Sequence, residues 1–357
     1  MIKYKKHIPF LDDELAKTIQ KTPLLRAKNL SAKVGVKEVY LKLDSTLPYS
    51  HTFKDRGAIS AISYLLKENK DTLICASCGN MSSAMAPVSA RAGIDCCIIL
   101  SSECNIPNKV AMSFSGAKII VFNGRFDEVD ELISKFSENH PNIACINTNL
   151  LDVYMQGLKT VYYELFEDLS AIHDEINIII PTADGTLLKA IYIAYMEYKT
   201  EYPKISFEPH LILAQPNKCA PIVQAFNNNC RNVSTWDITE KTHILSLSVD
   251  NPQHNGKFAL EAVYNTNGIA IAIDESFAEK NCKLLAMEEG IFTDDVGGIV
   301  MGALKEISED ERLKIFPTVC LITGNGLKTS GKFYGENLLT VGSKSQVMEF
   351  LKKAVVN

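Results

Sequence analysis

Short runs of aliphatic and β-branched residues alternate along the chain with longer segments in which apolar residues recur at helical spacing. The runs predict strands at 38–43, 72–76, 96–100, 118–122, 176–180, 210–214 and 319–322. The segments between them predict helices at 54–66, 82–92, 126–136, 156–165, 187–197, 275–286 and 299–307. This alternation predicts an α/β fold in which mostly parallel, twisted sheets are flanked by helices.

The length of the chain predicts its domain organisation. A chain of 357 residues is expected to form about two domains. It contains no internal repeat, low-complexity tract or long linker. The two domains are therefore expected to pack closely, and the cleft between them is the expected place for a site.

Composition argues against several classes of protein. The chain is 46% hydrophobic and 22% charged, as ordinary globular proteins are. A formal net charge of -5 and the lack of a basic tract argue against nucleic acid as a partner, because binding to phosphates relies on clustered Lys and Arg. Asp12 and Asp13 interrupt any N-terminal signal region, and no apolar run approaches the ~18 residues of a membrane span. We therefore expect a cytoplasmic protein without a membrane partner.

The cysteines and histidines do not predict a metal site. Ten cysteines without regular spacing are typical of free thiols in a reducing compartment. Cys75-Ala-Ser-Cys78 leaves open a redox-active pair or half of a metal site, but the chain has no second Cys-x-x-Cys. The seven histidines are scattered, without the spacing of metal ligands.

Four polar junctions follow predicted strands and carry the candidate chemistry. In the first junction, 50–57, Lys54 stands where a strand passes into a helix, so partial desolvation would make it a nucleophilic amine. A solvated lysine at a helix start is the alternative. The second junction, 76–83, places Gly79 and Asn80 at the start of a helix, where successive backbone N–H groups can bind a carboxylate. An ordinary turn with a helix cap is the alternative there.

The other two junctions repeat this arrangement. The third, 181–187, also precedes a predicted helix and could hold a phosphate, although it is poor in glycine. In the fourth, 323–328, two glycines let the backbone approach a ligand closely, and Thr323 offers a hydroxyl at a strand end. This segment could equally be an ordinary turn.

Taken in order, these junctions and several further motifs resemble the threonine synthase family of pyridoxal-phosphate enzymes, which have the type II, tryptophan-synthase-β-like fold. The resemblance covers nearly the whole chain, from Thr22-Pro-Leu24 to the fourth junction. The motifs that carry it are Phe53-Lys-Asp-Arg-Gly57, Ser77-Cys-Gly-Asn80, Pro107-Asn-Lys-Val110, Ser115-Gly-Ala-Lys118, Gly124-Arg-Phe-Asp127, Gly157-Leu-Lys-Thr160, Glu289-Gly-Ile-Phe292 and Gly297-Gly298. Most are weakly specific alone, but together and in family order they are strongly specific.

The resemblance implies an architecture. It predicts a smaller α/β domain at 57–157 and a larger cofactor-binding α/β domain made of 1–56 and 158–357. Each domain would contain a mostly parallel sheet, and the active site would lie in the cleft between them. The resemblance also implies a homodimer that acts on a small amino-acid substrate, phosphorylated in the case of threonine synthase.

The resemblance further implies roles for residues of the four junctions. Lys54 would hold pyridoxal 5'-phosphate covalently and then act as acid and base at the substrate's α and neighbouring carbons. Asn80 would hydrogen-bond the cofactor's ring hydroxyl, and Thr323 would meet its pyridine nitrogen as a neutral partner. The cofactor phosphate would be held by Ala183, Asp184, Gly185, Thr186 and Leu187, and the substrate carboxylate by Ser77, Cys78, Gly79, Met81 and Ser82.

The chain departs from the family pattern on the substrate side. His51 stands where glycine is usual, and Tyr154 stands where the family has an arginine that helps to bind the substrate phosphate. The neighbouring Glu of the family is Gln156 here. We expect His51 and Tyr154 to line the substrate site, and a plain packing role is the alternative for His51. Lys109 and Lys159 are the candidates for the missing cation.

The cofactor loop departs as well. Thr186 and Leu187 replace the usual Gly-Asn, and Asp184 adds a negative charge beside a dianion. The resemblance thus implies a lyase that converts O-phosphohomoserine and water to threonine and phosphate. One alternative is a β- or γ-replacement or elimination on another amino acid. A second is a non-catalytic cofactor-binding protein, which the joint retention of Lys54, Asn80 and Thr323 argues against.

Overall fold

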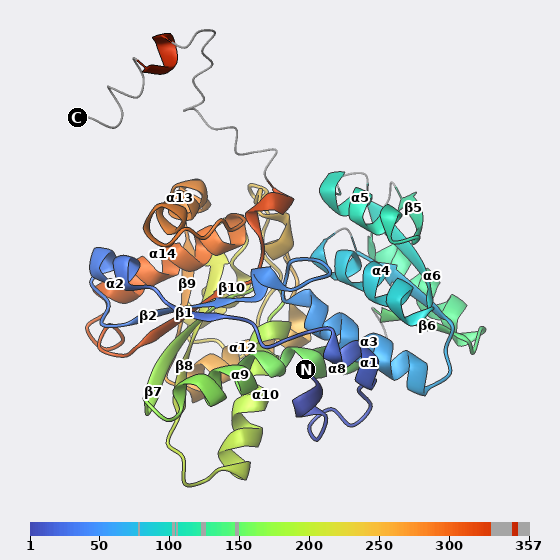
Figure 1. Cartoon of the computed structure of the whole chain (residues 1–357), viewed down its shortest axis with the longest axis horizontal. Coiled ribbons are helices and arrows are strands. Elements are labelled where there is room, and N and C mark those ends of the chain that lie inside the picture. The colour runs from blue at the N-terminus through green and yellow to red at the C-terminus, as the bar shows by residue number, and fades with distance from the viewer. Residues whose placement is uncertain are drawn as a thin grey trace.

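The computed structural model describes residues 1–77, 79–101, 104, 106–122, 126–146, 150–329 and 345–348. Its strands form two sheets, which lie in opposite halves of the molecule (Figure 1). The larger sheet has the order β1-β2-β10-β7-β8-β9, and all its neighbours are parallel except β1 and β2. The smaller sheet has the order β5-β4-β3-β6 and is parallel throughout. The prediction of an α/β fold with mostly parallel sheets is confirmed.

The strands of the larger sheet are β1 (Leu24–Arg26), β2 (Val39–Leu43), β7 (Glu175–Pro181), β8 (Glu208–Pro216), β9 (Ile269–Ile273) and β10 (Thr318–Ile322). Those of the smaller sheet are β3 (Thr72–Ala76), β4 (Asp95–Ser101), β5 (Lys118–Phe122) and β6 (Ile143–Cys145). All seven predicted strands are present, and β3 and β5 have the predicted bounds. The prediction missed β1 and β6, which have three residues each, and β9 at the sheet edge, where only Ala270 and Ile273 are buried.

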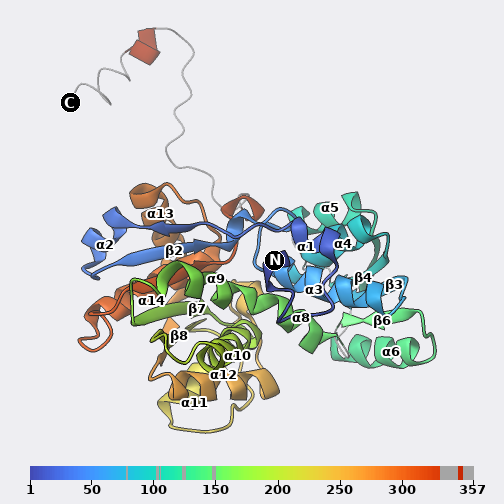
Figure 2. The same ribbon diagram turned by 60° about the horizontal axis from the view of Figure 1, so that its bottom comes forward.

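Helices flank both sheets (Figure 2). They are α1 (Asp13–Lys17), α2 (Lys28–Val34), α3 (Lys54–Lys67), α4 (Asn80–Ala92), α5 (Ile106–Phe114), α6 (Phe126–Glu138), α8 (Leu151–Leu158), α9 (Thr160–Leu169), α10 (Thr186–Glu201), α11 (Pro221–Asn227), α12 (Gln253–Asn265), α13 (Ala278–Glu289) and α14 (Asp295–Glu309). The apolar pattern missed α1, α2, α5, α11 and α12, although the resemblance matched Pro107–Val110 of α5 to a helix of the family. Within the described ranges, every helix is too short or too polar to span a bilayer.

One predicted helix, 156–165, is wrong. The structure has two helices there, because α8 ends at Leu158 and α9 begins at Thr160. Gly157 lies directly against α3, where an added Cβ would be 2.0 Å from the carbonyl oxygen of Arg56. The Thr160 hydroxyl donates to the Gly157 carbonyl at 2.7 Å, which caps α8 where the two helices part.

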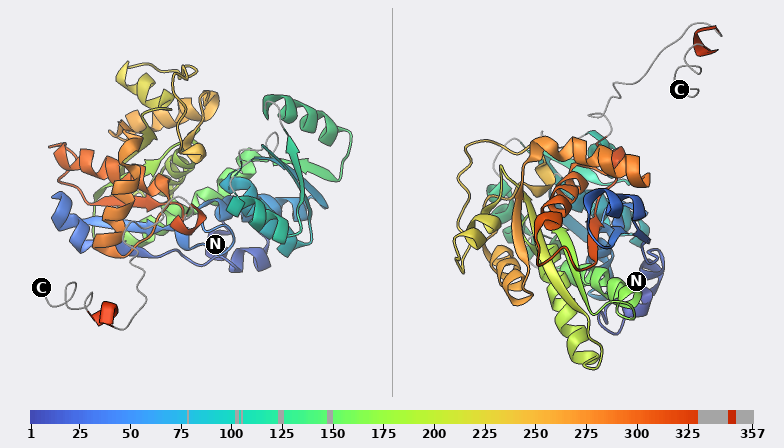
Figure 3. Two further views of the ribbon diagram at one scale, coloured as in Figure 1. Left: turned by 90° about the horizontal axis from the view of Figure 1, so that it is seen from above. Right: turned by 90° about the vertical axis from the view of Figure 1, so that its left-hand side faces the viewer.

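The two halves share one hydrophobic core. A single cluster of buried side chains contains Leu73 of β3 and Ile178 of β7, which belong to different sheets. The two halves lie side by side in the left view of Figure 3. Helix α3 packs on α4 and α8. Its first residue is Lys54, and the segment before it follows β2, so the lysine of the first junction lies where the chain passes from the larger sheet to the smaller half.

Candidate active site

The order of strands brings three of the four polar junctions together. Strands β2, β10 and β7 are neighbours and parallel, so their carboxyl ends lie side by side at one edge of the larger sheet. The segment before Lys54 follows β2, the Thr323 loop follows β10, and the 182–185 loop follows β7. The Phe53 N–H donates to the Thr323 carbonyl at 3.1 Å, and Thr52 forms an antiparallel bridge with Gly324.

Lys54 is half-buried among these loops without a counter-ion. Its Nζ lies 4.7 Å from the centre of the Phe53 ring and 5.8 Å from the centre of the Tyr154 ring. No carboxylate of the described residues is within ion-pair distance of this ammonium. Burial lowers the pKa of Lys54, and Asp184 opposes that shift through its charge. These surroundings favour a neutral, nucleophilic amine, as the first junction predicts.

Asp55 holds the segment that precedes Lys54. Its carboxylate accepts hydrogen bonds from the backbone N–H groups of Tyr49 at 2.8 Å and Ser50 at 2.9 Å, and from the Ser50 hydroxyl. The Ser50 and Thr52 hydroxyls lie 2.8 Å apart, and Thr52 accepts from the Lys54 N–H at 3.3 Å. Burial raises the pKa of Asp55, and these hydrogen bonds oppose the rise. These hydrogen bonds among residues 49–55 fix the backbone that leads into Lys54.

Arg56 fixes the other side of the same helix start. This guanidinium is fully buried and makes two hydrogen bonds each to Asp44 at the end of β2 and to Glu164 of α9. It also donates to the hydroxyls of Thr160 at 2.9 Å and Thr22 at 3.0 Å. The start of α3 is therefore tied to β2 and to α9 by charge-assisted hydrogen bonds.

The loop before α10 has the features of an anion site. Gly185 has a φ of +99°, and an added Cβ there would be 2.6 Å from the Asn255 carbonyl oxygen. Among the described residues, no acceptor is hydrogen-bonded to the first-turn N–H groups of Leu187 and Leu188. Asp184 accepts from the Thr186 N–H at 3.1 Å and from the Asn255 amide at 3.2 Å, which places a carboxylate beside these free donors.

The start of α4 meets the larger sheet through Lys328. Asn80 is the first residue of α4, and its Oδ1 accepts from Lys328 Nζ at 2.7 Å. The Gly79 N–H lies 3.4 Å from Ser77 Oγ, and an added Cβ at Gly79 would have no heavy atom within 4 Å. This hydrogen bond joins the fourth junction, 323–328, to the second junction, 76–83. Cys78 lies outside the described residues.

Met81 and Ser82 face the interior of the smaller half. Met81 packs against the main hydrophobic cluster. Ser82 is fully buried, and its hydroxyl lies 3.1 Å from the Cys75 thiol. Their side chains therefore serve packing, and only their backbone atoms remain available for a ligand at the start of α4.

Tyr154 is buried beside Lys54 with an unsatisfied hydroxyl. It is 1% exposed, and its hydroxyl has no hydrogen-bond partner among the described residues. Its ring occupies the space above Gly57, where an added Cβ would be 2.4 Å from ring carbons. Desolvation raises the pKa of Tyr154 well above its ordinary value, so the hydroxyl stays protonated and can donate. Leaving such a group unpaired costs free energy unless a ligand accepts from it.

The other expected substrate-side residues have different surroundings. His51 is exposed in a left-handed conformation, with a φ of +54°. Lys109 lies half-buried on α5. Lys159 donates to Glu197 at 2.7 Å, and Glu197 lies eleven residues, about 16 Å, beyond the first residue of α10. The expectation that Lys159 binds the substrate is therefore corrected, because its ammonium is buried in an ion pair far along that helix.

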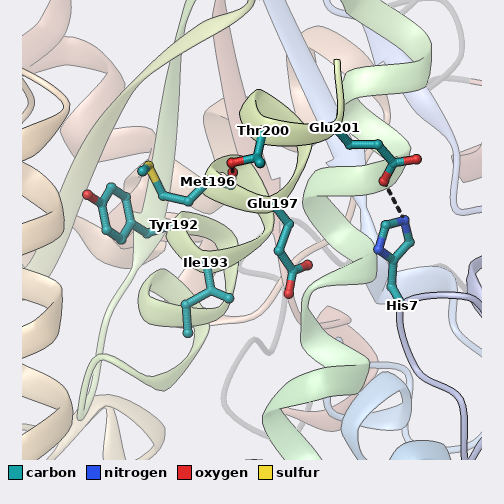
Figure 4. A pocket seen from close by; sticks show the side chains of 7 residues that line it. All are labelled: His7, Tyr192, Ile193, Met196, Glu197, Thr200 and Glu201. Atoms are coloured by element: carbon teal, nitrogen blue, oxygen red, sulfur yellow. Dashed lines mark hydrogen bonds and ion pairs between the residues drawn. The ribbon is translucent and has the colours of Figure 1, made fainter. Parts of the chain in front are cut away.

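The pocket near Glu197 is a separate feature of α10. It has a volume of about 580 Å³ and is lined by His7 and by side chains of the 192–201 segment (Figure 4). Glu197 pairs with Lys159, and Glu201 pairs with Lys6 and, at 3.4 Å, with His7. Both carboxylates are already neutralised by the protein, so this pocket offers no open ionic group for a ligand.

Sequence reasoning missed three side chains that connect the loops of the candidate site. Arg56 and Lys328 lie within motifs that the sequence singled out, but their partners are far away along the chain. Asn255 contacts the 184–186 loop from α12, a helix that the pattern did not predict. In the sequence, the only indication of these side chains is the polar residue found at each helix start, and it does not show which residues they contact.

The assembled groups fit pyridoxal phosphate. A lysine without a counter-ion is suited to a covalent bond with the cofactor's aldehyde, and unpaired helix-start N–H groups are suited to its phosphate. The unsatisfied Tyr154 hydroxyl and the hydroxyl of Thr323 are additional groups that a polar ligand can engage. Residues 54, 80, 183–187 and 323 could hold this cofactor.

Comparisons with known proteins agree with this fit. Residues 15–324 match the family described as pyridoxal-phosphate dependent enzyme. A threonine synthase of Methanocaldococcus jannaschii is 30% identical over 338 residues, which cover 91% of this chain and 80% of that protein.

The solved structures of maize serine racemase and of threonine deaminase isoform 2 from Solanum lycopersicum have the same fold. Their TM-scores are 0.73 and 0.71, and their sequence identities are 17% and 18%. The matches cover 98% and 99% of this chain and 97% and 93% of theirs. Because the family match covers most of the chain and includes Lys54, Asn80 and the 182–185 loop, the chain belongs to the pyridoxal-phosphate dependent enzymes, and its cofactor is pyridoxal 5'-phosphate.

Proposed function

We propose that this enzyme is a lyase of the threonine synthase type, which converts O-phosphohomoserine and water to threonine and phosphate. The observation that carries the proposal is Lys54, an enclosed lysine without a counter-ion at the meeting point of the loops after β2, β7 and β10. The curated relatives that match most of the chain, including those of Methanocaldococcus jannaschii and Halalkalibacterium halodurans, are named threonine synthase, which supports the choice of substrate.

The proposed site lies between two proposed domains, 57–157 and 1–56 with 158–357. The smaller sheet and α4 fall in the first, and the larger sheet falls in the second. Lys54 belongs to the larger domain and Asn80 to the smaller one. A substrate bound between them would touch both, so its binding would be coupled to their relative position.

In this proposal the bound cofactor supplies an electron sink for negative charge that develops on the substrate. The protein supplies orientation and protons. Lys54 holds the cofactor and, once released by the substrate, moves protons at the α and neighbouring carbons; burial favours the neutral amine that this task requires. Asn80 would hold the cofactor ring through its hydroxyl, and Thr323 would hold it through its pyridine nitrogen. The N–H groups at the starts of α10 and α4 bind the cofactor phosphate and the substrate carboxylate.

Tyr154 is the proposed donor to the leaving phosphate. Its hydroxyl is buried, protonated and unpaired, which suits an incoming acceptor. Departure of the phosphate breaks the bond between the substrate's Cγ and the ester oxygen. Cβ loses one hydrogen as a proton, Cγ gains one proton, and water then adds its hydroxyl to Cβ while its remaining proton goes to the released phosphate. A single neutral donor replaces the family's arginine fork here.

A second candidate function keeps the fold and cofactor but changes the substrate. It is an elimination or replacement on an amino acid that carries no phosphate. The observation that favours it is the chemistry of two groups near Lys54, the neutral hydroxyl of Tyr154 and the carboxylate of Asp184. A dianionic leaving group would be better stabilised by cations than by these two groups.

Phosphate release from O-phosphohomoserine tests the proposal, with Lys54→Ala as the inactive control. Tyr154→Phe removes only the unpaired hydroxyl. We expect it to weaken substrate binding by about ten- to a hundred-fold, because a hydrogen bond to a charged group is worth ~1.5–3 kcal/mol. The same variant should unfold at higher denaturant concentration, because it no longer buries an unsatisfied group. Turnover of serine or threonine without phosphate release by the wild type would favour the second candidate instead.

A further inference from the structure

Lys328 connects the two halves of the site through hydrogen bonds to neutral groups. It is the last residue of the short 3-10 helix Gly326–Lys328, which follows β10. Its Nζ donates to Asn80 Oδ1 at 2.7 Å and to the Ser50 carbonyl oxygen at 3.0 Å. One acceptor begins α4 in the smaller half, and the other precedes Lys54 in the larger half. One ammonium thus contacts both the first residue of α4 and the segment that leads into Lys54.

The ammonium fixes which way the Asn80 amide faces. An ammonium has three donors and no acceptor, so it can only meet the oxygen of the amide. The orientation of an amide is normally inferred from its network, and here the network permits one choice. The Nδ2 donors of Asn80 therefore point away from Lys328, and they make no hydrogen bond to another described residue.

We propose that Lys328 is a positioning residue, which holds Asn80 so that its N–H group faces the ring oxygen of the cofactor and favours the deprotonated form of that oxygen. The proposal rests on the cofactor site proposed above. A donor bonded to the charged form of a group stabilises that form. A cation on the amide oxygen also polarises the amide and strengthens its N–H group as a donor.

The charges around Lys328 are consistent with this role. Two carboxylates lower the electrostatic cost of the ammonium from different elements: Asp294 at the start of α14 and Asp55 in α3. None of the described carboxylates forms an ion pair with it, and burial lowers the pKa of Lys328 to about 8. The ammonium is therefore charged at neutral pH, yet its short contact is directed to Asn80 rather than to a carboxylate.

The test is the absorption spectrum of the holoenzyme, recorded across pH without substrate, together with retention of the cofactor on dilution. Lys328→Met should retain the cofactor about ten-fold less tightly, as expected for a lost charge-assisted contact. It should also shift the spectrum toward the form with a protonated ring oxygen. Lys328→Arg, which keeps a cationic donor, should restore most of both properties. Lys33→Met, at a lysine 61% exposed on α2, is the matched control and should change neither.

Two further variants separate positioning from a purely structural role. In an Asn80→Ala background, Lys328→Met should cause no additional spectral change, because Lys328 acts through Asn80. Asn80→Asp keeps an acceptor for Lys328 but offers the ring oxygen no donor, so it should shift the spectrum without lowering the melting temperature. Additive effects in the double variant, or wild-type spectra in Lys328→Met or Asn80→Asp, would overturn the proposal. Because no substrate is used, failure to turn over O-phosphohomoserine would leave this test intact.

Discussion

Replacing Arg56 with methionine should cost a large part of the protein's stability. Arg56 donates six hydrogen bonds of 2.6–3.0 Å, four of them to the carboxylates of Asp44 and Glu164. These carboxylates are 3% and 0% exposed, so neither can be hydrated when the guanidinium is removed. Lys42 still pairs with Glu164 at 2.7 Å, which leaves Asp44 as the main uncompensated charge.

Breaking a buried ion pair by removing one partner costs ~3–5 kcal/mol. Natural domains unfold with a total of ~5–15 kcal/mol, so the loss should be evident in a urea titration. Arg26→Met is the matched control, because Arg26 pairs with Glu38 at 3.2 Å while 55% exposed, and such pairs contribute ~0–1 kcal/mol. Adding Asp44→Asn to Arg56→Met should recover part of the loss. If Arg56→Met were no less stable than Arg26→Met, the network would not support the helix start.

The same network predicts an acid limit. Burial alone would raise the pKa of Glu164, but Arg56 and Lys42 lower it to about 2, from an ordinary value of 4.5. A carboxylate with a lowered pKa in the folded state stabilises the protein above its unfolded pKa, and this contribution is lost as pH falls through the folded value. Stability should therefore decline between about pH 4.5 and pH 2, and Arg56→Met should lack most of this decline because its Glu164 has lost the larger cation.

Two further predictions concern acids near the site. Burial raises the pKa of Asp294 to about 6, from an ordinary value of 3.8, so folding is penalised as pH rises from about 4 to 6. Asp294→Asn keeps a helix-capping side chain and should be more stable at pH 7, by up to about 3 kcal/mol; equal unfolding midpoints at pH 7 would contradict this. Asp184→Asn removes a like charge beside the cofactor phosphate but can still accept from the Thr186 N–H. It should retain the cofactor about ten-fold more tightly in titrations, and weaker retention would show that this carboxylate supports the loop.

The sequence predicted the features that depend on local pattern. A short apolar run bounded by polar residues favours a strand, and β3 and β5 have the expected bounds, although β3 is mostly buried and β5 is not. The polar junctions were also visible, because each follows such a run. Their convergence needs the strand order, which places β10 between β2 and β7, and this order depends on pairings across the whole chain.

The missing parts of the site depend on contacts between distant residues. Arg56 meets Glu164 across 108 residues, and Lys328 meets Asn80 across 248 residues. No local property of Lys328 distinguishes it from a solvated lysine after a turn. For Lys159 the sequence suggested a contact that the structure does not support. Its place in a motif suggested a ligand contact, but in the folded protein it donates to Glu197. Which cation serves a site is decided by tertiary packing.

The position of β10 in the larger sheet has a consequence for biosynthesis. This strand is formed by Thr318–Ile322, yet it lies between β2 and β7, which the ribosome delivers far earlier. A nascent chain that ends before residue 318 thus exposes the facing edges of two buried strands, and open edges of this kind promote association with other chains. The loop that bears Thr323 and the lysine that contacts Asn80 emerge directly after this strand. The larger sheet and the candidate cofactor site are therefore both completed late in synthesis, after residue 318 has been made.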